Sequence, residues 1–591
     1  MSIPASFASI FPSQNRHEAP VSIERPTSLC IPLLILIAVW TVIVLIVNPV
    51  GEFMVNDDWA FVRALETLTF EGRMPTTGWG PSWAPGGPSL IVHLMWGRLF
   101  TFFGGFSITV LRISVLTLGI LGSCALLVLL RLAGASAWVA LWGALTLVVN
   151  PLFLSQSFTY MTDITFAGMA VFSLLSLHAG VKRASTPMIV LGMLFALCSI
   201  LTRQLGVIIP LAFVTACFLH PRGTDLGRWK MVFLVTLVDL VPWAAYEYFL
   251  YSIGSTPITQ HQVFQNLLLY PQTRGLFAYL AFLCANFFSA GLLYVGFLIS
   301  PVLALKYRVL SGWRVFRYFF IILTSTFLLL ESALLTGLID LPVFFSRNII
   351  FDFGIGPILL KDTYILEITR TAAIPKPLYY LLLYWSILSL GAVLGLMYSS
   401  LRRLLRTESG AAHQEIKFLP LFALLAGLMY LGMITPGGFH DRYLIPVCIF
   451  FIVWVVSDLE LGWDQSLRPS AVLGGFMPFL LLAFLAVLGT HDFMDMKRSL
   501  KKAQDYLVHQ MNVQPCDIDG GLEFNGYHCY SPDFRPHEGL SWWWVRKEDY
   551  LITLGPLPDY QLVRSFPFKR YFGPDGAVFV LRPLGTSGDT G

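Results

Sequence analysis

The chain has 591 residues, of which 56% are hydrophobic, 14% aromatic and only 13% charged, and its formal net charge is +4. Soluble proteins carry roughly 25% charged residues. This composition excludes a soluble enzyme, a disordered protein and a disulfide-rich secreted module, and the small net charge argues against nucleic-acid binding. A polytopic membrane protein remains.

Apolar runs recur along the chain at the length that a bilayer requires, which is about 20 residues. No small-residue cleavage site follows the first run, 31–50, so we interpret it as an uncleaved signal anchor. The later runs lie near 107–130, 136–152, 164–181, 187–202, 204–219, 231–252, 276–303, 318–339, 377–400, 418–435, 443–457 and 470–489. The sequence thus predicts an all-α polytopic membrane protein with about 13 transmembrane helices.

Basic residues predict the orientation of these spans, because short loops rich in lysine and arginine face the cytoplasm. With the N-terminus inside, the inside loops carry Arg131, Lys182, Arg183, Arg222, Arg228, Lys230, Lys306, Arg308, Arg314, Arg317, Arg402, Arg403, Arg406 and Lys417. The outer connections are mostly longer and mixed in charge. An odd number of spans then places the C-terminal tail outside.

We therefore divide the chain into three parts. Residues 1–30 form a cytoplasmic segment, 31–489 a transmembrane domain with its first outer loop at 51–106, and 490–591 a small extracytoplasmic α/β domain.

The tail has its own pattern of elements. Residues 492–513 have the spacing of an amphipathic helix, and short strands are expected at 550–555, 560–566 and 577–583. Cys516 and Cys529 can form a disulfide if the tail faces an oxidising compartment.

An acidic pair follows the first span, in the sequence NDDWAFVRALETLTF. The apolar spacing after Asp57 and Asp58 predicts an amphipathic helix on the outer surface. A helix N-terminus favours the ionised carboxylate. An ionised carboxylate at the edge of the apolar transmembrane domain can act as a general base. A simple helix cap is the alternative.

Two further polar positions interrupt apolar runs on the same side. Asp163, in SFTYMTDITFAG, can bind a divalent cation such as Mg or Mn together with Asp57 or Asp58, or can simply cap the following helix. Arg203, in LTRQLG, can hold a phosphate or form a structural salt bridge to Asp163.

The later outer loops add more candidates. His440, Asp441 and Arg442 stand in GGFHDRYLIP at the mouth of a span, and Arg347 stands in an outer loop. Single arginines there are often only interface anchors. The absence of P-loop and GxGxxG signatures argues against a nucleotide donor bound on the inside.

Together these motifs resemble GT-C glycosyltransferases: an acidic pair after the first span, an aspartate before the fourth, an arginine in the short hairpin at 187–219, and an RYL-P signature near the last spans. The likeness is strongest to the branch of protein mannosyltransferases and aminoarabinose transferases (glycosyltransferase families 39 and 83), and it covers about residues 30–490.

The resemblance implies inverting transfer of a sugar from a polyprenyl-phosphate donor to an acceptor hydroxyl on a lipid, glycan or protein, at the outer face of a membrane such as the bacterial inner membrane. Asp57 resembles the catalytic base, and Asp58 matches the second acid. Arg203, Arg442 and Arg347 are the candidates for binding the donor phosphate. Asp58 and Asp163 are the candidate metal ligands.

Other functions are open at this stage. A transporter or lipid flippase would agree with Asp239 and Glu331, which lie inside apolar runs. A sugar-polymer ligase or polymerase would need a long outer loop such as 340–376. A non-catalytic scaffold that binds a partner through its tail would not need the acidic pair.

Overall fold

The structure is a computed structural model. It describes residues 27–73, 87–220, 225–254, 275–306, 348–351, 354–368, 376–405, 417–437, 440–458, 469–571 and 573–584, with a few single residues between them.

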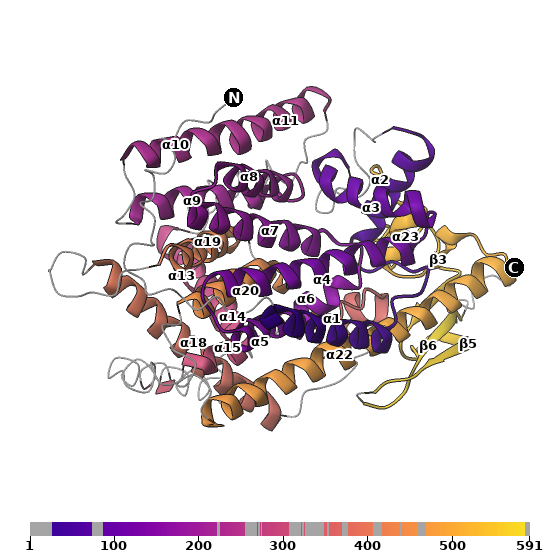
Figure 1. Ribbon diagram of the computed structural model, residues 1–591. Helices are drawn as coiled ribbons and strands as arrows, with labels where there is room; N and C mark the ends of the chain where they lie inside the picture. Colours follow the sequence, from indigo (N-terminus) through magenta and orange to yellow (C-terminus); the bar gives the residue numbers. More distant parts are fainter. Residues whose placement is uncertain are drawn as a thin grey trace, which may run out of the picture.

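A bundle of apolar helices makes up most of the molecule (Figure 1). Its helices are α1 (Thr27–Val47), α4 (Ile108–Leu132), α5 (Ala137–Val148), α6 (Pro151–Ser157), α7 (Thr162–Arg183), α8 (Thr186–Ile200), α9 (Ile208–Leu219), α10 (Asp225–Val235), α11 (Val241–Ser252), α13 (Leu276–Ala285), α14 (Tyr294–Leu298), α15 (Ser300–Leu303), α18 (Lys376–Leu405), α19 (Phe418–Ile434), α20 (Ile445–Ser457) and α22 (Pro469–Asp505). Short 3-10 or π segments join or extend them: η4 (Gln204–Val207), η5 (Thr236–Leu240), η6 (Asn286–Leu293), η7 (Ala304–Lys306), η9 (Thr435–Gly437), η10 (Asp441–Leu444) and η11 (Tyr506–Gln510).

The predicted apolar runs correspond to these helices, except the run near 318–339, which lies almost wholly outside the described residues. Among the described residues, seven helices are long and apolar enough to cross a membrane, or eight if α5 and α6, bent by 65°, form one broken span. The chain is therefore a multi-pass membrane protein. The number of 13 spans stays a prediction.

The outer surface of the bundle suits a lipid environment. Large apolar side chains are exposed on α1 and α13, among them Leu45 at 75% and Phe277 at 88%. Helices satisfy their own backbone hydrogen bonds, so such side chains can face hydrocarbon without cost.

Glycines bring α7 and α8 into close contact. A Cβ atom on Gly192 would lie 2.8 Å from the backbone nitrogen of Leu177, and one on Gly180 would lie 2.8 Å from the backbone nitrogen of Ile189. Small residues allow helix backbones in a membrane to approach in this way. The tight hairpin returns the chain after α8 to the beginning of α7, where Asp163 lies.

The tail begins as a continuation of the last membrane helix. The predicted final span and the predicted amphipathic helix form the single helix α22, so the boundary placed at 489/490 falls inside it. Beyond it lie β3 (Ile518–Asp519), α23 (Leu522–Cys529), β4 (Tyr550–Thr553), β5 (Tyr560–Phe568) and β6 (Gly576–Pro583).

The tail strands form one sheet in the order β3-β4-β6-β5, with β3 and β4 parallel and the other pairs antiparallel. A separate two-stranded sheet joins β1 (Ile350–Phe351) to β2 (Gly354–Ile355), and η8 (Lys361–Ile365) follows it. The three predicted strands are confirmed, and so is the disulfide between Cys516 and Cys529.

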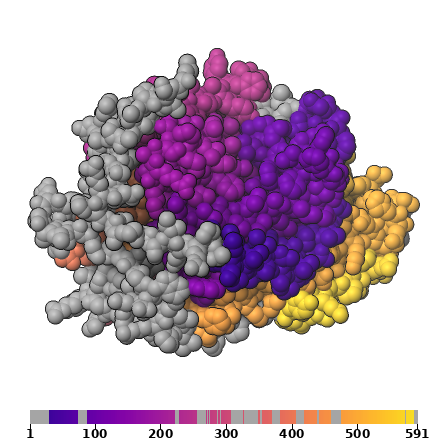
Figure 2. All heavy atoms as spheres, viewed as in Figure 1, coloured from indigo at the N-terminus to yellow at the C-terminus, as the bar shows by residue number. Residues whose placement is uncertain are grey.

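The first outer loop and the tail meet at one end of the bundle. There α2 (Asp58–Phe70) and α3 (Ile91–Gly104), preceded by the short η3 (Pro88–Leu90), lie beside α23 (Figure 1). In Figure 2 the N-terminal and C-terminal colours adjoin on the same side of the molecule. The predicted amphipathic helix after the first span is confirmed as α2. It was predicted to lie on the outer surface, but α3 and α23 cover it.

The contact between α2 and α23 leaves no spare volume. Trp59 is fully buried, and its ring lies 5.6 Å from that of Tyr530 and 5.4 Å from that of Trp544. A Cβ atom on Gly526 would lie 2.5 Å from the Trp59 side chain.

We expect Gly526→Ala to destabilise the protein by about 1–3 kcal/mol, because an added methyl group would overpack this contact. The measurement is the thermal unfolding midpoint of the detergent-purified protein. Gly432→Ala on α19 is the control, because no described atom lies within 4 Å of its added Cβ. Equal midpoints for the two variants would contradict the prediction.

Candidate active site at the outer end of the bundle

Asp57 and Arg442 form a buried ion pair. Asp57 is the N-cap residue of α2 but makes no side-chain capping hydrogen bond. Its Oδ2 atom instead accepts a hydrogen bond from Nη2 of Arg442 at 3.0 Å. Both side chains are less than 10% exposed. The structure therefore brings together two of the predicted site residues, which are 385 positions apart.

Asp163 and Arg203 form a second pair nearby. Asp163 lies in the first turn of α7, and Arg203 is the N-cap residue of η4, directly after α8. Nη1 of Arg203 donates to Oδ1 of Asp163 at 2.8 Å, and Nε donates to the Thr162 hydroxyl at 3.0 Å. The salt bridge named above as the alternative for Arg203 is present.

The Tyr443 ring contacts the arginines of both pairs. The guanidinium carbon of Arg203 is 5.0 Å from the ring centre, and that of Arg442 is 5.5 Å from it. Burial lowers the pKa of the neighbouring His440, and Arg442 lowers it further, while Asp57 and Asp163 oppose the shift. His440 thus shares one electrostatic environment with the two ion pairs.

Several hydrogen-bonding atoms in this cluster have no partner. Among the described residues, Nε and Nη1 of Arg442 and Oδ2 of Asp163 are buried without a hydrogen bond. An unsatisfied buried polar group costs roughly 1–3 kcal/mol, and more when it is charged. The open N–H groups on Nε and Nη1 of Arg442 therefore indicate that this cluster can bind an anionic ligand.

Asp441 holds Arg442 in place. Its carboxylate accepts hydrogen bonds from the backbone N–H groups of Ile349 (3.0 Å), Ile350 (2.9 Å) and Arg442 itself (2.8 Å). Burial raises the pKa of Asp441 to about 6, and these three donors oppose that shift. The residue before Arg442 is thereby fixed to the β1 segment.

Asp58 faces other partners than Asp57. Its Oδ1 atom accepts from the Val55 N–H at 2.7 Å, and its Oδ2 atom accepts from the Tyr160 N–H at 3.3 Å. Burial raises the pKa of Asp58 to about 7, although Arg112 opposes the rise. The adjacent acids therefore have different surroundings, and Asp58 joins the first loop to the turn before α7.

Arg112 was not among the candidates that we derived from the sequence. It lies inside α4 and donates from Nη1 to the carbonyl oxygens of Pro49 (3.0 Å) and Gly51 (2.7 Å), and from Nη2 to that of Phe53. A charged residue inside the apolar run 107–130 was the available signal. Arg112 holds the chain between the first span and Asp57.

His93 and Tyr160 were also missed. The buried His93 ring lies within hydrogen-bonding distance of the Thr165 hydroxyl (2.9 Å) and the Tyr160 carbonyl oxygen (3.2 Å). Its ring centre lies 4.2 Å from that of Tyr160. These contacts tie α3 to the start of α7, near Asp163.

The remaining predicted residues do not join the cluster. Arg347 lies outside the described residues. Within the part of the chain that the structure describes, no group of three or more His, Cys, Asp or Glu side chains could hold a metal ion. Asp58 and Asp163, the predicted ligands, have the partners given above. No step of the mechanism below uses a divalent metal, and Mg or Mn stays a prediction.

Comparisons with known proteins give one distant likeness. No family model and no curated protein matches the chain. It is similar to the crystal structure of ArnT from Cupriavidus metallidurans bound to undecaprenyl phosphate, at 14% identity over 83% of this chain and 84% of that chain, with a TM-score of 0.35. The apo structure of the same ArnT gives 14% identity, 83% of both chains and a TM-score of 0.34.

A likeness this distant carries no argument about the function of this chain.

The raised pKa of Asp58 predicts how its contribution to protein stability depends on pH. Its value in the folded protein, about 7, lies above the ordinary value of 3.8. The folded state therefore binds the proton more tightly than the unfolded state, and the contribution of Asp58 to the free energy of unfolding falls as the pH rises from about 4 to about 7.

We expect wild type to lose thermal stability relative to Asp58→Asn between pH 5 and pH 8, measured as the difference between their unfolding midpoints. A difference that is constant with pH, or that shifts in favour of wild type, would contradict this assignment.

Proposed function

We propose that this protein is an integral-membrane glycosyltransferase of the GT-C type. It moves a sugar from a polyprenyl-phosphate donor to an acceptor hydroxyl on the extracytoplasmic face. The acceptor is a lipid, a glycan or a protein, and the membrane is the bacterial inner membrane.

The observation that carries the proposal is the unpartnered part of Arg442. The guanidinium is buried, donates one hydrogen bond to Asp57, and keeps its Nε and Nη1 N–H groups open. Each of these open N–H groups can donate a hydrogen bond to an oxygen of an anion such as a phosphate. A donor phosphate can bind there while Asp57 stays in place, and Arg203 lies against the same Tyr443 ring as Arg442.

Asp57 then has the position of a general base. The acceptor hydroxyl loses its proton to the Asp57 carboxylate while its oxygen forms a bond to the anomeric carbon of the sugar. The bond between that carbon and the phosphate oxygen breaks, and its electron pair leaves with polyprenyl phosphate. Arg442 and Arg203 stabilise the charge that develops on the phosphate. Preorganised charges in a site without water are effective at this task.

The tail supports an extracytoplasmic position for the site. The Cys516–Cys529 disulfide favours an oxidising compartment for this region. The backbone N–H of Asn56, next to Asp57, donates to Glu523 in the same tail. The site therefore belongs to the tail side, which the positive-inside rule also places outside.

We expect Asp57→Asn to lower sugar transfer by roughly 10²- to 10⁴-fold, the usual contribution of a general base. Membrane insertion should stay normal, but the unfolding midpoint should fall, because asparagine leaves the buried charge of Arg442 without its counterion; transfer is therefore measured well below that midpoint. The assay incubates purified protein with a panel of polyprenyl-phosphate sugars and measures release of polyprenyl phosphate. Asp549→Asn is the control, because the Asp549 side chain is 40% exposed and pairs with the exposed Lys547. Near-wild-type transfer by Asp57→Asn would refute the role of Asp57.

We expect Arg442→Gln to reduce transfer by roughly 10²- to 10³-fold, because it removes one preorganised charge from the leaving phosphate. The same assay measures it, with the donor concentration varied. Arg442→Lys should recover only part of the activity, because an ammonium group lacks the planar fork. Full activity in Arg442→Lys would show that a point charge is enough and would contradict phosphate binding through the open guanidinium N–H groups.

A further inference from the structure

The backbone next to Asp57 has an unusual conformation. Asn56 has φ = 57°, in the left-handed region, which asparagine adopts more often than other residues with a side chain but still uncommonly. It is buried, and its N–H group donates to the tail. A conformation of this kind persists only when its surroundings hold it.

Glu523 at the start of α23 holds that N–H group. Its Oε1 atom accepts from the Asn56 N–H at 3.1 Å, a contact between residues 467 positions apart. The same oxygen accepts from Nζ of Lys497 on α22 at 2.5 Å. Both Lys497 and Glu523 are nearly fully buried. Burying two charges is costly unless they are paired, so each holds the other in place.

The tail also holds the residues on the other side of Asp57. Trp59 packs against Gly526, Tyr530 and Trp544, all from the tail. Asp57 thus lies between two anchors, the Asn56 hydrogen bond and the Trp59 contact.

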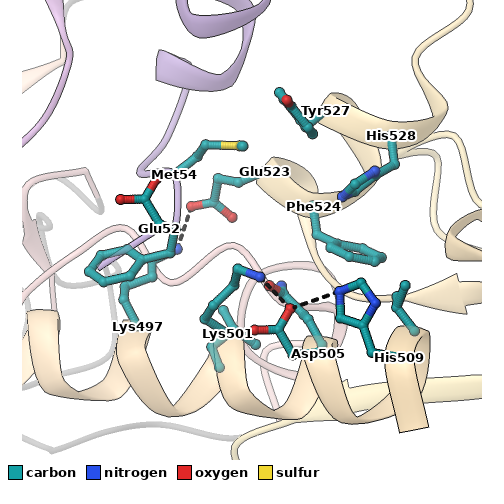
Figure 3. A pocket seen from close by; sticks show the side chains of 14 residues that line it. Glu52, Met54, Lys497, Lys501, Asp505, His509, Glu523, Phe524, Tyr527 and His528 are labelled. Carbon is teal, nitrogen blue, oxygen red and sulfur yellow. Dashed lines mark hydrogen bonds and ion pairs between the residues drawn. The ribbon is translucent and has the colours of Figure 1, made fainter. Parts of the chain in front are cut away.

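The Lys497–Glu523 pair borders a cavity of about 130 Å³ between α22, α23 and the segment Glu52–Met54 (Figure 3). The first-loop segment therefore has open space on this side. The hydrogen bond from Glu523 is a specific point of attachment for the loop.

We infer that Glu523, fixed by Lys497, is a positioning residue for Asp57. It sets the direction of the Asp57 carboxylate through the backbone of Asn56 and touches neither substrate nor Arg442. The tail thereby becomes part of the catalytic apparatus.

The chain offers a matched control in the same cavity. Lys501 and Asp505 lie on α22 close to Lys497 and form an ion pair there. Their side chains are 33% and 43% exposed. In Figure 3 this pair lies on the α22 side of the cavity, away from Glu523.

The first measurement is hydrogen exchange of the full-length protein in nanodiscs, followed in the peptide that covers residues 52–58. We expect Glu523→Ala to speed exchange of the Asn56 amide by roughly tenfold or more, the order for losing a hydrogen bond to a charged acceptor. Glu523→Gln, which keeps an acceptor oxygen, should speed it less. Asp505→Ala should leave it unchanged. Unchanged exchange in Glu523→Ala would overturn the inference.

The second measurement is the kinetics of sugar transfer, and this part rests on the proposed function. Displacing a catalytic group by about 1 Å can cost up to roughly 100-fold in rate. We expect Glu523→Ala and Lys497→Met to lower kcat by roughly 10- to 100-fold, with the KM for the polyprenyl-phosphate donor changed less than about twofold. Glu523→Gln should recover part of kcat.

The two measurements separate the two claims. If wild type releases no polyprenyl phosphate from any donor, the proposed function fails, and hydrogen exchange alone decides whether Glu523 holds the loop. If wild type is active and Glu523→Ala and Glu523→Gln lose no more kcat than Asp505→Ala, the positioning role is wrong. If Glu523→Ala does not fold, Glu523→Gln and Lys497→Met give the same decision.

Discussion

The buried contact between Asp57 and Arg442 is the constraint on which the rest of the site depends. It joins the chain after the first span to the chain before α20, across 385 positions. A buried ion pair contributes little net stability, because removing two charges from water costs several kcal/mol per ion. The surrounding structure must therefore hold both partners in position. Asp441 does so for Arg442, and Glu523 and Arg112 do so for the loop that carries Asp57.

This arrangement explains why so many charged groups lie at one end of an apolar bundle. Arg112 binds three backbone carbonyl groups of the first loop. Asp58 binds two backbone N–H groups, and Asp441 binds three. In each case a buried charge is satisfied by backbone groups, which fixes the loop more firmly than a contact between two side chains would. Among the described residues, Nε and Nη1 of Arg442 and Nε of Arg112 stay without a partner in this network.

Most segments that form the site are far apart in the sequence. The hairpin α7–α8 is local, and its glycines bring Arg203 back to Asp163. The other contacts join distant parts, because α2 lies against α23 and the continuous helix α22 carries the tail out of the membrane bundle. The tail therefore packs on the first loop as a part of the same body.

The sequence by itself determined the elements whose signal is local. Apolar runs of membrane length, alternating strands in the tail, the cysteine pair and the acidic pair before an amphipathic helix could each be recognised from neighbouring residues, because periodicity and hydrophobicity act over short distances. The motifs also indicated Asp57, Asp163, Arg203 and Arg442 as site candidates. Only the tertiary structure decided that Asp57 and Asp58 face different partners, and that the tail residues Lys497 and Glu523 hold the loop beside Asp57. Those contacts depend on how whole helices pack. A contact with a residue several hundred positions away does not change the local pattern of hydrophobic and polar residues, so the sequence does not indicate it.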